Sequence, residues 1–354
     1  MKTDIKSLNK QELKKFITDA GFPGFRADQL YDWMHKKLVL SLDEMSNVPK
    51  DLKAYIENET ELVTLQHVTH LESKDGSTAK FLFRLPDGHV IESVRMVYKH
   101  GISVCISSQV GCRMGCRFCA STLGGLVRSL TPSEMLEQIY RIEKMTGERV
   151  SNIVVMGTGE PLDNFDNLIK FIELITDENG LNISQRNITV STCGIVPNIK
   201  RLADLDLSIT LAISLHASND EERRKIMPVA NKYSIAEIME ATDYYFKVTG
   251  RRLTYEYSLI AGENDDLKSA EGLTKLLAGK GAHINLIPVN PIKERDYKQS
   301  GEGHIVRFKN ILEKSGINVT IRREMGADID AACGQLRKDY MDGNVTLKEE
   351  ESKG

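Results

Sequence analysis

The sequence has no long hydrophobic run. No apolar segment approaches the roughly 18–20 residues that a membrane-spanning helix needs. The first residues, from Met1 to Lys6, contain no hydrophobic segment of the signal-peptide type. We therefore expect a cytoplasmic protein that is not attached to a membrane.

An excess of charge of one sign is also absent, because 47 Lys and Arg face 50 Asp and Glu and leave a net charge of −3. This net charge does not indicate nucleic-acid binding. It does not exclude such binding either, since only the local surface has to be basic. The 41% hydrophobic and 27% charged content is typical of a soluble globular protein. The length of 354 residues suggests about two domains.

Cysteine is scarce, and its distribution excludes a disulfide framework. Two of the six cysteines, Cys193 and Cys333, stand alone. The other four crowd into fifteen positions, namely Cys105, Cys112, Cys116 and Cys119. In a chain of this length, such crowding indicates a metal or redox site in a reducing compartment.

The first hundred residues divide into a helical part and a strand-rich part. Residues 1–60 have helical patterns, with capping-box signals that begin at Asn9 and Ser41 and a break at 21–24. Residues 61–100 change to alternation in Phe81–Leu85 and Val90–Met96, and Asp-Gly pairs at 75–76 and 87–88 predict hairpin turns. We expect a small helical accessory domain followed by an antiparallel β-meander.

From residue 102 onward, strand and helix patterns alternate. The candidate strands are Ile102–Ser107, Asn152–Met156, Asn187–Ser191, Ser208–His216, Leu253–Ile260 and His283–Pro288, with Ile317–Arg322 as one more. The candidate helices are Pro132–Lys144, Phe165–Ile175, Pro197–Leu205, Asp220–Ile226, Ile235–Lys247, Asp265–Leu277 and Gly303–Ser315. Six βα units predict an α/β fold whose parallel sheet is closed or partly closed into a barrel. We assign this barrel to residues 101–340 and expect the Glu- and Lys-rich tail, 341–354, to be disordered.

Chemistry-bearing residues follow the predicted strands. The cysteine cluster, the Gly-Thr-Gly-Glu sequence at 157–160, Ser191, His216 and Asn290 all lie at or just after a strand end. In parallel α/β sheets the active site lies at the carboxyl ends of the strands. Five separate segments therefore predict one site at the same rim.

The cysteine loop has the pattern C-x3-C-x2-C, formed by Cys112, Cys116 and Cys119. Four thiolates complete a [4Fe–4S] cluster, so three leave one iron open to another ligand, such as the amino and carboxylate groups of S-adenosylmethionine (SAM). The alternative is a structural zinc site with Cys105 as its fourth ligand, because structural zinc takes four closed ligands. Zinc knuckles usually pair two C-x2-C hooks, whereas this chain has one.

The loop resembles the signature of the radical SAM superfamily, and longer motifs narrow the resemblance. They are Cys105–Cys112 (CISSQVGC), Gly157–Leu162 (GTGEPL), Ser214–His216 (SLH), Asn285–Pro291 (NLIPVNP) and Asp328–Leu336 (DIDAACGQL). Together they resemble the RNA adenosine methyltransferases called RlmN and their antibiotic-resistance relatives called Cfr. The resemblance runs from about Gly24 to Leu336 and implies a partial (β/α)6 radical SAM barrel.

The resemblance also implies site residues. Cys112, Cys116 and Cys119 would bind one [4Fe–4S] cluster, and SAM would contact Gly159, Glu160, Ser191, Ser214, Leu215, His216 and Asn290. Taken alone, the Gly-Glu pair is an ordinary strand-to-helix turn, His216 is as often a hydrogen-bonded rim histidine, and the serine and asparagine suit turns or caps.

Three catalytic residues are implied in the same way. Cys333 would carry a methyl group, Cys105 would resolve a covalent enzyme–RNA intermediate by forming a disulfide with Cys333, and Glu92 would accept a proton. Without the resemblance, the residues favour non-catalytic roles. A lone cysteine is usually a small buried hydrophobe, and a glutamate on an alternating strand usually faces solvent. Cys193 matches no family role, and we interpret it as structural.

The resemblance implies methylation of adenine C2 in 23S rRNA, and of an adenosine next to the anticodon loop in tRNA, with two SAM molecules per turnover. An electron donor such as flavodoxin or ferredoxin would be needed, and we expect a monomer. The alternatives are methylation at C8, as in Cfr, and a non-catalytic zinc-containing RNA-binding protein. The candidate RNA contacts are Arg113, Arg117, Arg128, Lys200, Arg201, Arg223, Arg224, Lys225, Arg322 and Arg323, of which Arg113, Arg117, Arg322 and Arg323 flank catalytic segments.

Overall fold

The computed structural model describes residues 2–291, 294–322, 329, 336, 337, 340 and 343. Its centre is a set of seven parallel strands: β6 (Gly101–Cys105), β9 (Val150–Val155), β10 (Ile188–Thr192), β11 (Thr210–Ser214), β12 (Leu253–Leu259), β13 (His283–Pro288) and β14 (Asn318–Ile321). They pair in that order, each with the next. All six predicted βα strands and the additional one are therefore confirmed, with ends that differ by at most two residues.

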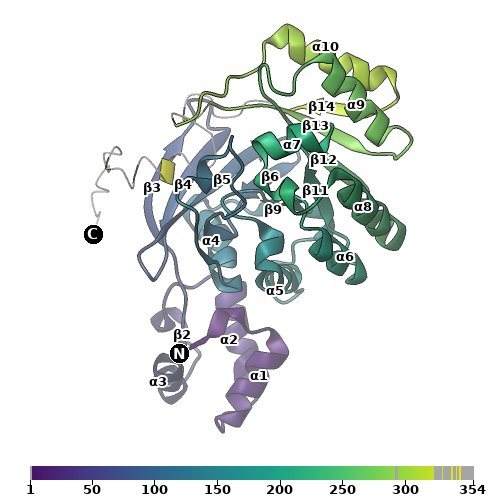
Figure 1. The fold of residues 1–354 in the computed structure, drawn as a ribbon. Coiled ribbons are helices and arrows are strands. Elements are labelled where there is room, and N and C mark those ends of the chain that lie inside the picture. The colour runs from purple at the N-terminus through teal and green to yellow at the C-terminus, as the bar shows by residue number, and fades with distance from the viewer. Residues whose placement is uncertain are drawn as a thin grey trace.

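Helices cover the outer face of the parallel strands (Figure 1). They are α4 (Pro132–Thr146), α5 (Phe165–Thr176), α6 (Val196–Asp204), α7 (Asp220–Ile226), α8 (Ile235–Thr249), α9 (Leu267–Leu277) and α10 (Glu302–Lys314). The sequence signals explain their ends: α4 begins with a Thr131–Glu134 capping box and Pro132, and a left-handed glycine, Gly147, follows its last residue. Among the described residues, no helix is long and apolar enough to cross a membrane.

The meander extends the sheet on its β6 side. It consists of β3 (Gln66–Glu72), β4 (Thr78–Arg84) and β5 (Val90–Tyr98), and the complete order is β14-β13-β12-β11-β10-β9-β6-β5-β4-β3. The Asp-Gly turns lie where predicted, with φ of 67° at Gly76 and 88° at Gly88. Because β5 pairs antiparallel with β6, Val94 lies opposite Cys105. The meander therefore forms one continuous wall with the barrel.

The N-terminal helices are α1 (Lys10–Asp19), α2 (Phe25–His35) and α3 (Lys50–Glu59), and Figure 1 shows them below the sheet beside α4. Two short strands that we did not predict, β1 (Thr3–Asp4) and β2 (Thr60–Glu61), pair in parallel. Both capping boxes are present, but that of Ser41 begins a single 3-10 turn, Leu42–Glu44, rather than an α-helix.

A buried ion pair connects the N-terminal helical region to the barrel. Lys6 Nζ lies 2.5 Å from Glu137 Oε1 on α4, and both side chains are almost completely buried. Lys6 also donates to the carbonyl of Val63, and the backbone N–H of Leu65 donates to the second oxygen of Glu137. These extra hydrogen bonds satisfy charges that would be costly to bury unpaired.

The buried histidine on α2 predicts acid sensitivity. Burial lowers the pKa of His35 from 6.5 to about 3, and its Nδ1 lies 2.9 Å from the hydroxyl of Tyr140. Between these two pKa values the unfolded chain binds a proton that the folded chain excludes, so stability falls as the pH falls. We expect this histidine to lower the free energy of unfolding by up to about 1.4 kcal/mol per pH unit in that window.

Denaturant unfolding at several pH values between 7 and 4 measures this slope. The His35→Phe variant, which cannot take up the proton, should show a slope smaller by about one proton. Equal slopes in the two proteins would contradict the assignment, whatever the variant does to stability at pH 7.

Candidate functional site

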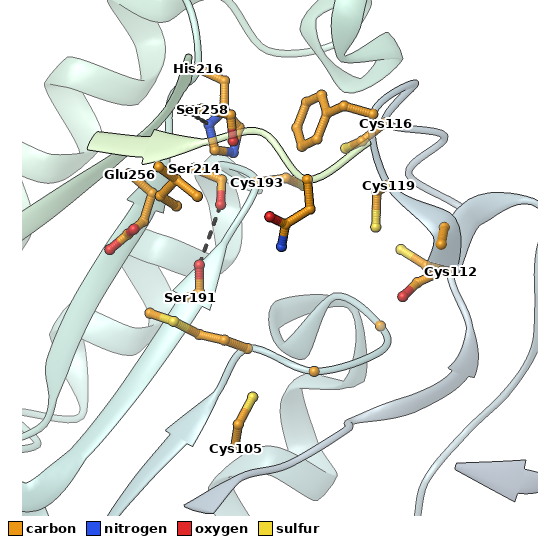
Figure 2. Close-up of a pocket in the computed structure, with 18 of the residues that line it drawn as sticks. Cys105, Cys112, Cys116, Cys119, Ser191, Cys193, Ser214, His216, Glu256 and Ser258 are labelled. Atoms are coloured by element: carbon orange, nitrogen blue, oxygen red, sulfur yellow. Dashed lines mark hydrogen bonds between the residues drawn. The ribbon is translucent and has the colours of Figure 1, made fainter. Parts of the chain in front are cut away.

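One cavity of about 690 Å³ opens at the carboxyl ends of the parallel strands. Its walls include all three loop cysteines and Cys105, together with Gly159, Glu160, Ser191, Ser214, His216 and Asn290. Figure 2 shows the labelled members of this set around a single space. The predicted convergence of five segments on one rim is therefore observed.

A small ribbon that we did not predict holds the cysteine loop. The strands β7 (Gln109–Gly111) and β8 (Leu126–Ser129) pair antiparallel on either side of it. Gly111 has φ of 77°, and a Cβ at this position would lie 2.0 Å from the carbonyl oxygen of Gly125, so the crossing requires glycine. Beside it, the N–H of Cys112 donates to that same carbonyl over 2.9 Å.

Hydrogen bonds also fix the second half of the loop. The hydroxyl of Thr122 donates to the carbonyls of Cys116 and Cys119 over 3.0 and 2.9 Å. The N–H of Arg117 donates to the carbonyl of Ile226, the last residue of α7. The loop is therefore tied both to itself and to the barrel.

The three loop cysteines lie together on one side of the cavity, with Cys105 across from them (Figure 2). Burial raises the pKa of Cys112 to about 12 and that of Cys116 well above its usual value, so both prefer the protonated form until a metal binds them. Within the described part of the chain, no three His, Cys, Asp or Glu side chains lie close enough to hold a single ion.

The set of donors and the size of the cavity favour a cluster over zinc. Structural zinc draws its ligands around one ion, whereas each thiolate of an iron–sulfur cluster binds a different iron. Three thiols that share one side of a large cavity fit a [4Fe–4S] cluster, with the remaining space left for a ligand on the open iron.

The Gly-Thr-Gly-Glu turn after β9 is shaped by close packing. A Cβ on Gly159, where φ is 110°, would lie 2.6 Å from the Cβ of Gln109. Glu160 is buried, and it accepts hydrogen bonds from the N–H groups of Leu162 and Cys193 over 3.0 and 2.8 Å. Burial raises the pKa of Glu160, while these donors oppose the rise. A carboxylate held in this way is suited to pair with an ammonium group.

The resemblance assigns this turn to SAM, so Gly159→Ala is expected to weaken SAM binding. The added methyl group must move Gln109 or the turn, and the alanine must adopt a left-handed φ, which costs about 1–3 kcal/mol, or roughly 5- to 150-fold in affinity. Equilibrium SAM binding to the metal-loaded protein measures the loss. Gly124→Ala is the matched control, because a Cβ there meets nothing within 4 Å and φ is not positive. Equal affinities for the two variants would contradict the prediction.

His216 is held as a neutral ring. Its Nδ1 accepts the N–H of Ser258 over 2.9 Å, and burial lowers its pKa to about 3. The ring meets Phe118 of the cysteine loop edge-on, with centroids 4.9 Å apart. Since Nδ1 is the acceptor, the proton lies on Nε2, which is available as a donor in the cavity wall.

Ser191 and Ser214 approach each other across neighbouring strands, with their hydroxyls 3.3 Å apart (Figure 2). Asn290 is exposed at the end of β13 and lines the cavity. Leu215 differs from the other predicted SAM contacts, because its side chain is completely buried in the hydrophobic core and does not line the cavity. Leu215 directly follows the last residue of β11, and its side chain packs into the core, whereas Ser214 and His216 line the cavity.

The prediction of Arg223 as an RNA contact is wrong. Arg223 is completely buried, and its guanidinium donates to the carbonyls of Cys193, Ser214 and Leu215 over 2.6, 3.3 and 3.1 Å. It therefore fixes the ends of β10 and β11 beneath the site. Runs of basic residues are usually solvated, so the sequence carried no signal of this burial.

Other basic candidates form ion pairs. Arg113 pairs with Asp163, Arg128 with Asp87 and Glu134, Lys200 with Glu240, Arg201 with Asp166 and Lys225 with Glu221. Arg117 and Arg322 are exposed, and Arg322 lines the cavity. Arg323 lies outside the described residues.

Glu92 is buried rather than solvent-facing. It shares a face of β5 with Val94 and Met96, which line the cavity, but it is not itself part of the wall. Its carboxylate accepts the backbone N–H of Arg337, so the strand contacts the C-terminal segment there. Cys333, and with it the predicted partnership with Cys105, lies outside the described residues, as does the predicted tail apart from Gly343.

The cavity wall also includes residues that we did not predict as contacts, among them Cys193, Glu256 and Ser258. Glu256 is buried on β12 and accepts a hydrogen bond from Asn285 over 2.9 Å, and burial raises its pKa. The sequence does contain a signal that could have identified Glu256. This glutamate lies between Tyr255 and Tyr257 in a strand that is covered on both faces, where a charged residue is unusual. Cys193 packs against Cys116 and Met227, so its wall position is largely apolar.

Comparison with known proteins gives the family. Residues 106–271 match the model of the radical SAM superfamily, and residues 3–62 match that of the ribosomal RNA large subunit methyltransferase N-terminal domain. A relative from Lachnospira eligens, named "Probable dual-specificity RNA methyltransferase RlmN", is 65% identical over 96% of this chain and 97% of its own. The chain belongs to the RlmN family. An RlmN relative of the same name from Lachnoclostridium phytofermentans is 61% identical over 96% of each chain.

The RlmN fold is also matched by a solved structure. The crystal structure of a radical SAM methyltransferase from Sphaerobacter thermophilus superimposes with a TM-score of 0.90 at 41% identity and covers 94% of this chain and 98% of that one. The predicted fold class, an α/β radical SAM barrel with an antiparallel extension, is confirmed. As members of the radical SAM superfamily, RlmN proteins use a [4Fe–4S] cluster and SAM.

Proposed function

We propose that this protein methylates C2 of a specific adenosine in 23S rRNA and of an adenosine beside the anticodon loop of tRNA. The observation that supports this most is that one cavity, in a chain of the RlmN family, combines the three-cysteine loop, the Gly-Glu turn and Cys105. The dual-specificity name of the relatives supports two kinds of RNA substrate.

The wall residues divide between the cluster and SAM. Cys112, Cys116 and Cys119 would hold the cluster, and the buried Glu160 with Gly159 would receive the SAM ammonium group. Further SAM contacts would come from Ser191, Ser214, His216 and Asn290, and from the backbone at Leu215. When bound and reduced by a donor such as flavodoxin or ferredoxin, the cluster and SAM supply a 5′-deoxyadenosyl radical.

The remaining steps of methyl transfer use cysteines of the chain. The Cys333 thiolate first takes the methyl group of one SAM and releases S-adenosylhomocysteine. When bound at this site, a second SAM would supply the radical to which the Cys333 methyl group loses a hydrogen atom. The Cys333 methylene carbon then bonds to adenine C2. The adduct gives up one electron, which the oxidised cluster would take back, and the C2 proton, which Glu92 or Cys105 accepts.

Release requires a second thiol. The Cys105 thiolate attacks the sulfur of Cys333, the S–C bond breaks, and its electron pair stays on carbon, which takes up a proton to become the methyl group. The two cysteines are left as a disulfide that an external thiol must reduce before the next turnover. Cys105 lies in the cavity wall, where such an attack needs it to be.

Methylation in vitro tests the proposal. Anaerobically reconstituted protein, SAM, a reductant and either 23S rRNA fragments or tRNA should yield 2-methyladenosine, identified by mass spectrometry against positional standards. A product that co-elutes with 8-methyladenosine would replace the proposal with Cfr-type chemistry. A colourless, iron-free, zinc-containing protein without activity would support the RNA-binding alternative instead.

A further inference from the structure

A second cavity of about 380 Å³ lies away from the catalytic site, where the N-terminal region meets the meander and α4. It is lined by the segment 64–66, by Leu40, by the turn between β4 and β5, and by two arginines, Arg84 and Arg141. None of the proposed chemistry uses it.

The two arginines carry charge that no described acid neutralises. Arg84 donates to the hydroxyl of Tyr340 over 2.7 Å and, at 3.4 Å, to the side chain of Gln66, both of which are neutral groups. The Nε of Arg141 is buried without a hydrogen-bond acceptor. Within the described part of the chain, neither arginine forms an ion pair. Because guanidinium stays protonated in proteins, the cavity is positively charged.

The acids near Arg141 are already engaged. Glu137, one helical turn earlier on α4, is held by Lys6, and Glu134 is held by Arg128. Arg95 on β5 and Arg128 on β8 each have two carboxylate partners. Among the described residues, Arg141 and Arg84 thus lack the carboxylate partners that Arg95 and Arg128 have, and both line a cavity that can take an acceptor from outside the chain.

A phosphate group has the matching chemistry. Guanidinium presents a planar fork of N–H donors that binds phosphate oxygens in pairs. Phosphate contacts position a nucleic acid without reading its sequence, and a chain with net charge −3 needs local basic sites to hold RNA.

The position suits a nucleotide other than the target. The cavity includes Gly88 at the start of the β5 hairpin, and the catalytic cavity includes Val94 on the same strand. Six residues of strand span about 20 Å, so a phosphate here would belong to a neighbouring part of the substrate.

We propose that Arg141 and Arg84 form a binding site for one backbone phosphate of the substrate RNA. This inference rests on the proposed RNA methylation. The site would anchor the RNA between the N-terminal region and the meander while the target adenine occupies the barrel.

Salt dependence of RNA binding tests the site. The holoenzyme with Arg141→Gln should bind a substrate RNA fragment more weakly at low salt. The slope of log K against log salt should be shallower by about 0.7 for single strands or 0.9 for duplex. Arg141→Lys, which keeps the charge, should retain the wild-type slope. Arg149→Gln removes an exposed arginine just beyond α4 and outside the cavity, so it is the matched control and should leave the slope unchanged.

The possible results distinguish failure of the phosphate site from failure of the proposed RNA methylation. An unchanged slope for Arg141→Gln, or equal reductions for Arg141→Gln and Arg149→Gln, would overturn the inference alone. If inorganic phosphate binding depends on Arg141 while the RNA slope does not, the cavity binds free anions and the RNA assignment is wrong. Absence of RNA binding by the wild-type protein would overturn the proposed function and this inference with it. Formation of 5′-deoxyadenosine without RNA should be the same in all variants, since the site lies outside the catalytic cavity.

Discussion

Cys116→Ala is expected to abolish methylation of both RNA substrates, a loss of more than about three orders of magnitude, because no 5′-deoxyadenosyl radical can form without the cluster. Iron content after anaerobic reconstitution should fall from about four per chain to near zero. The reason is that the loop supplies just three thiolates, so losing one leaves two corners of the cluster without a protein ligand.

The control for this experiment lies beside the mutated residue. Cys193 packs against Cys116 in the same apolar cluster and is equally free of a disulfide. Cys193→Ala removes a buried thiol without removing a proposed ligand, so it should keep about four irons. If both variants lose iron equally, the loss reflects packing, and the assignment of Cys116 as a ligand fails.

Cys105→Ala should trap RNA on the protein. The variant still has the proposed methyl carrier, Cys333, and the cluster cysteines, so the bond to adenine C2 can form. It lacks the thiol that attacks Cys333 and releases the product. We expect multiple turnover to stop and a covalent protein–RNA adduct to accumulate, visible as a shifted band on a denaturing gel that nuclease treatment removes.

A second variant makes this result specific. Cys105→Ala combined with Cys333→Ala should form no adduct, because the carrier is missing, and Cys333→Ala alone should bind SAM but transfer no methyl group. Methylation by Cys333→Ala would show that the cysteine relay is wrong. An adduct that persists in the double variant would place the covalent link on another residue.

The cysteine relay and the cluster differ in what supports them. The loop cysteines lie on one side of a described cavity, and Cys105 faces them across it. The role of Cys333 rests on sequence resemblance. The described neighbour of its segment is Arg337, whose backbone N–H bonds to Glu92 on the cavity face of β5. This contact supports the proposal that Glu92 and the C-terminal segment act at the same site.

The sequence by itself determined the class of protein and most of the barrel. Strand and helix periods are local, so the seven parallel strands and their helices could be assigned from pattern alone. The spacing of Cys112, Cys116 and Cys119 likewise predicts a cluster ligand set without any fold. The common rim followed because parallel strands place their carboxyl ends at one edge.

The tertiary structure decided which side chains face the cavity and which charged side chains are buried or ion-paired. The strand pattern alone favours a solvent-facing Glu92, and Arg223 was a candidate RNA contact. Both are buried, because burial depends on contacts between segments far apart in sequence. Leu215 points into the core, whereas its neighbours on either side reach the cavity. Arg141 stands out because Lys6, more than a hundred residues away, occupies the acid it would otherwise pair with. Local pattern cannot reveal such pairings, since they form when the chain has folded.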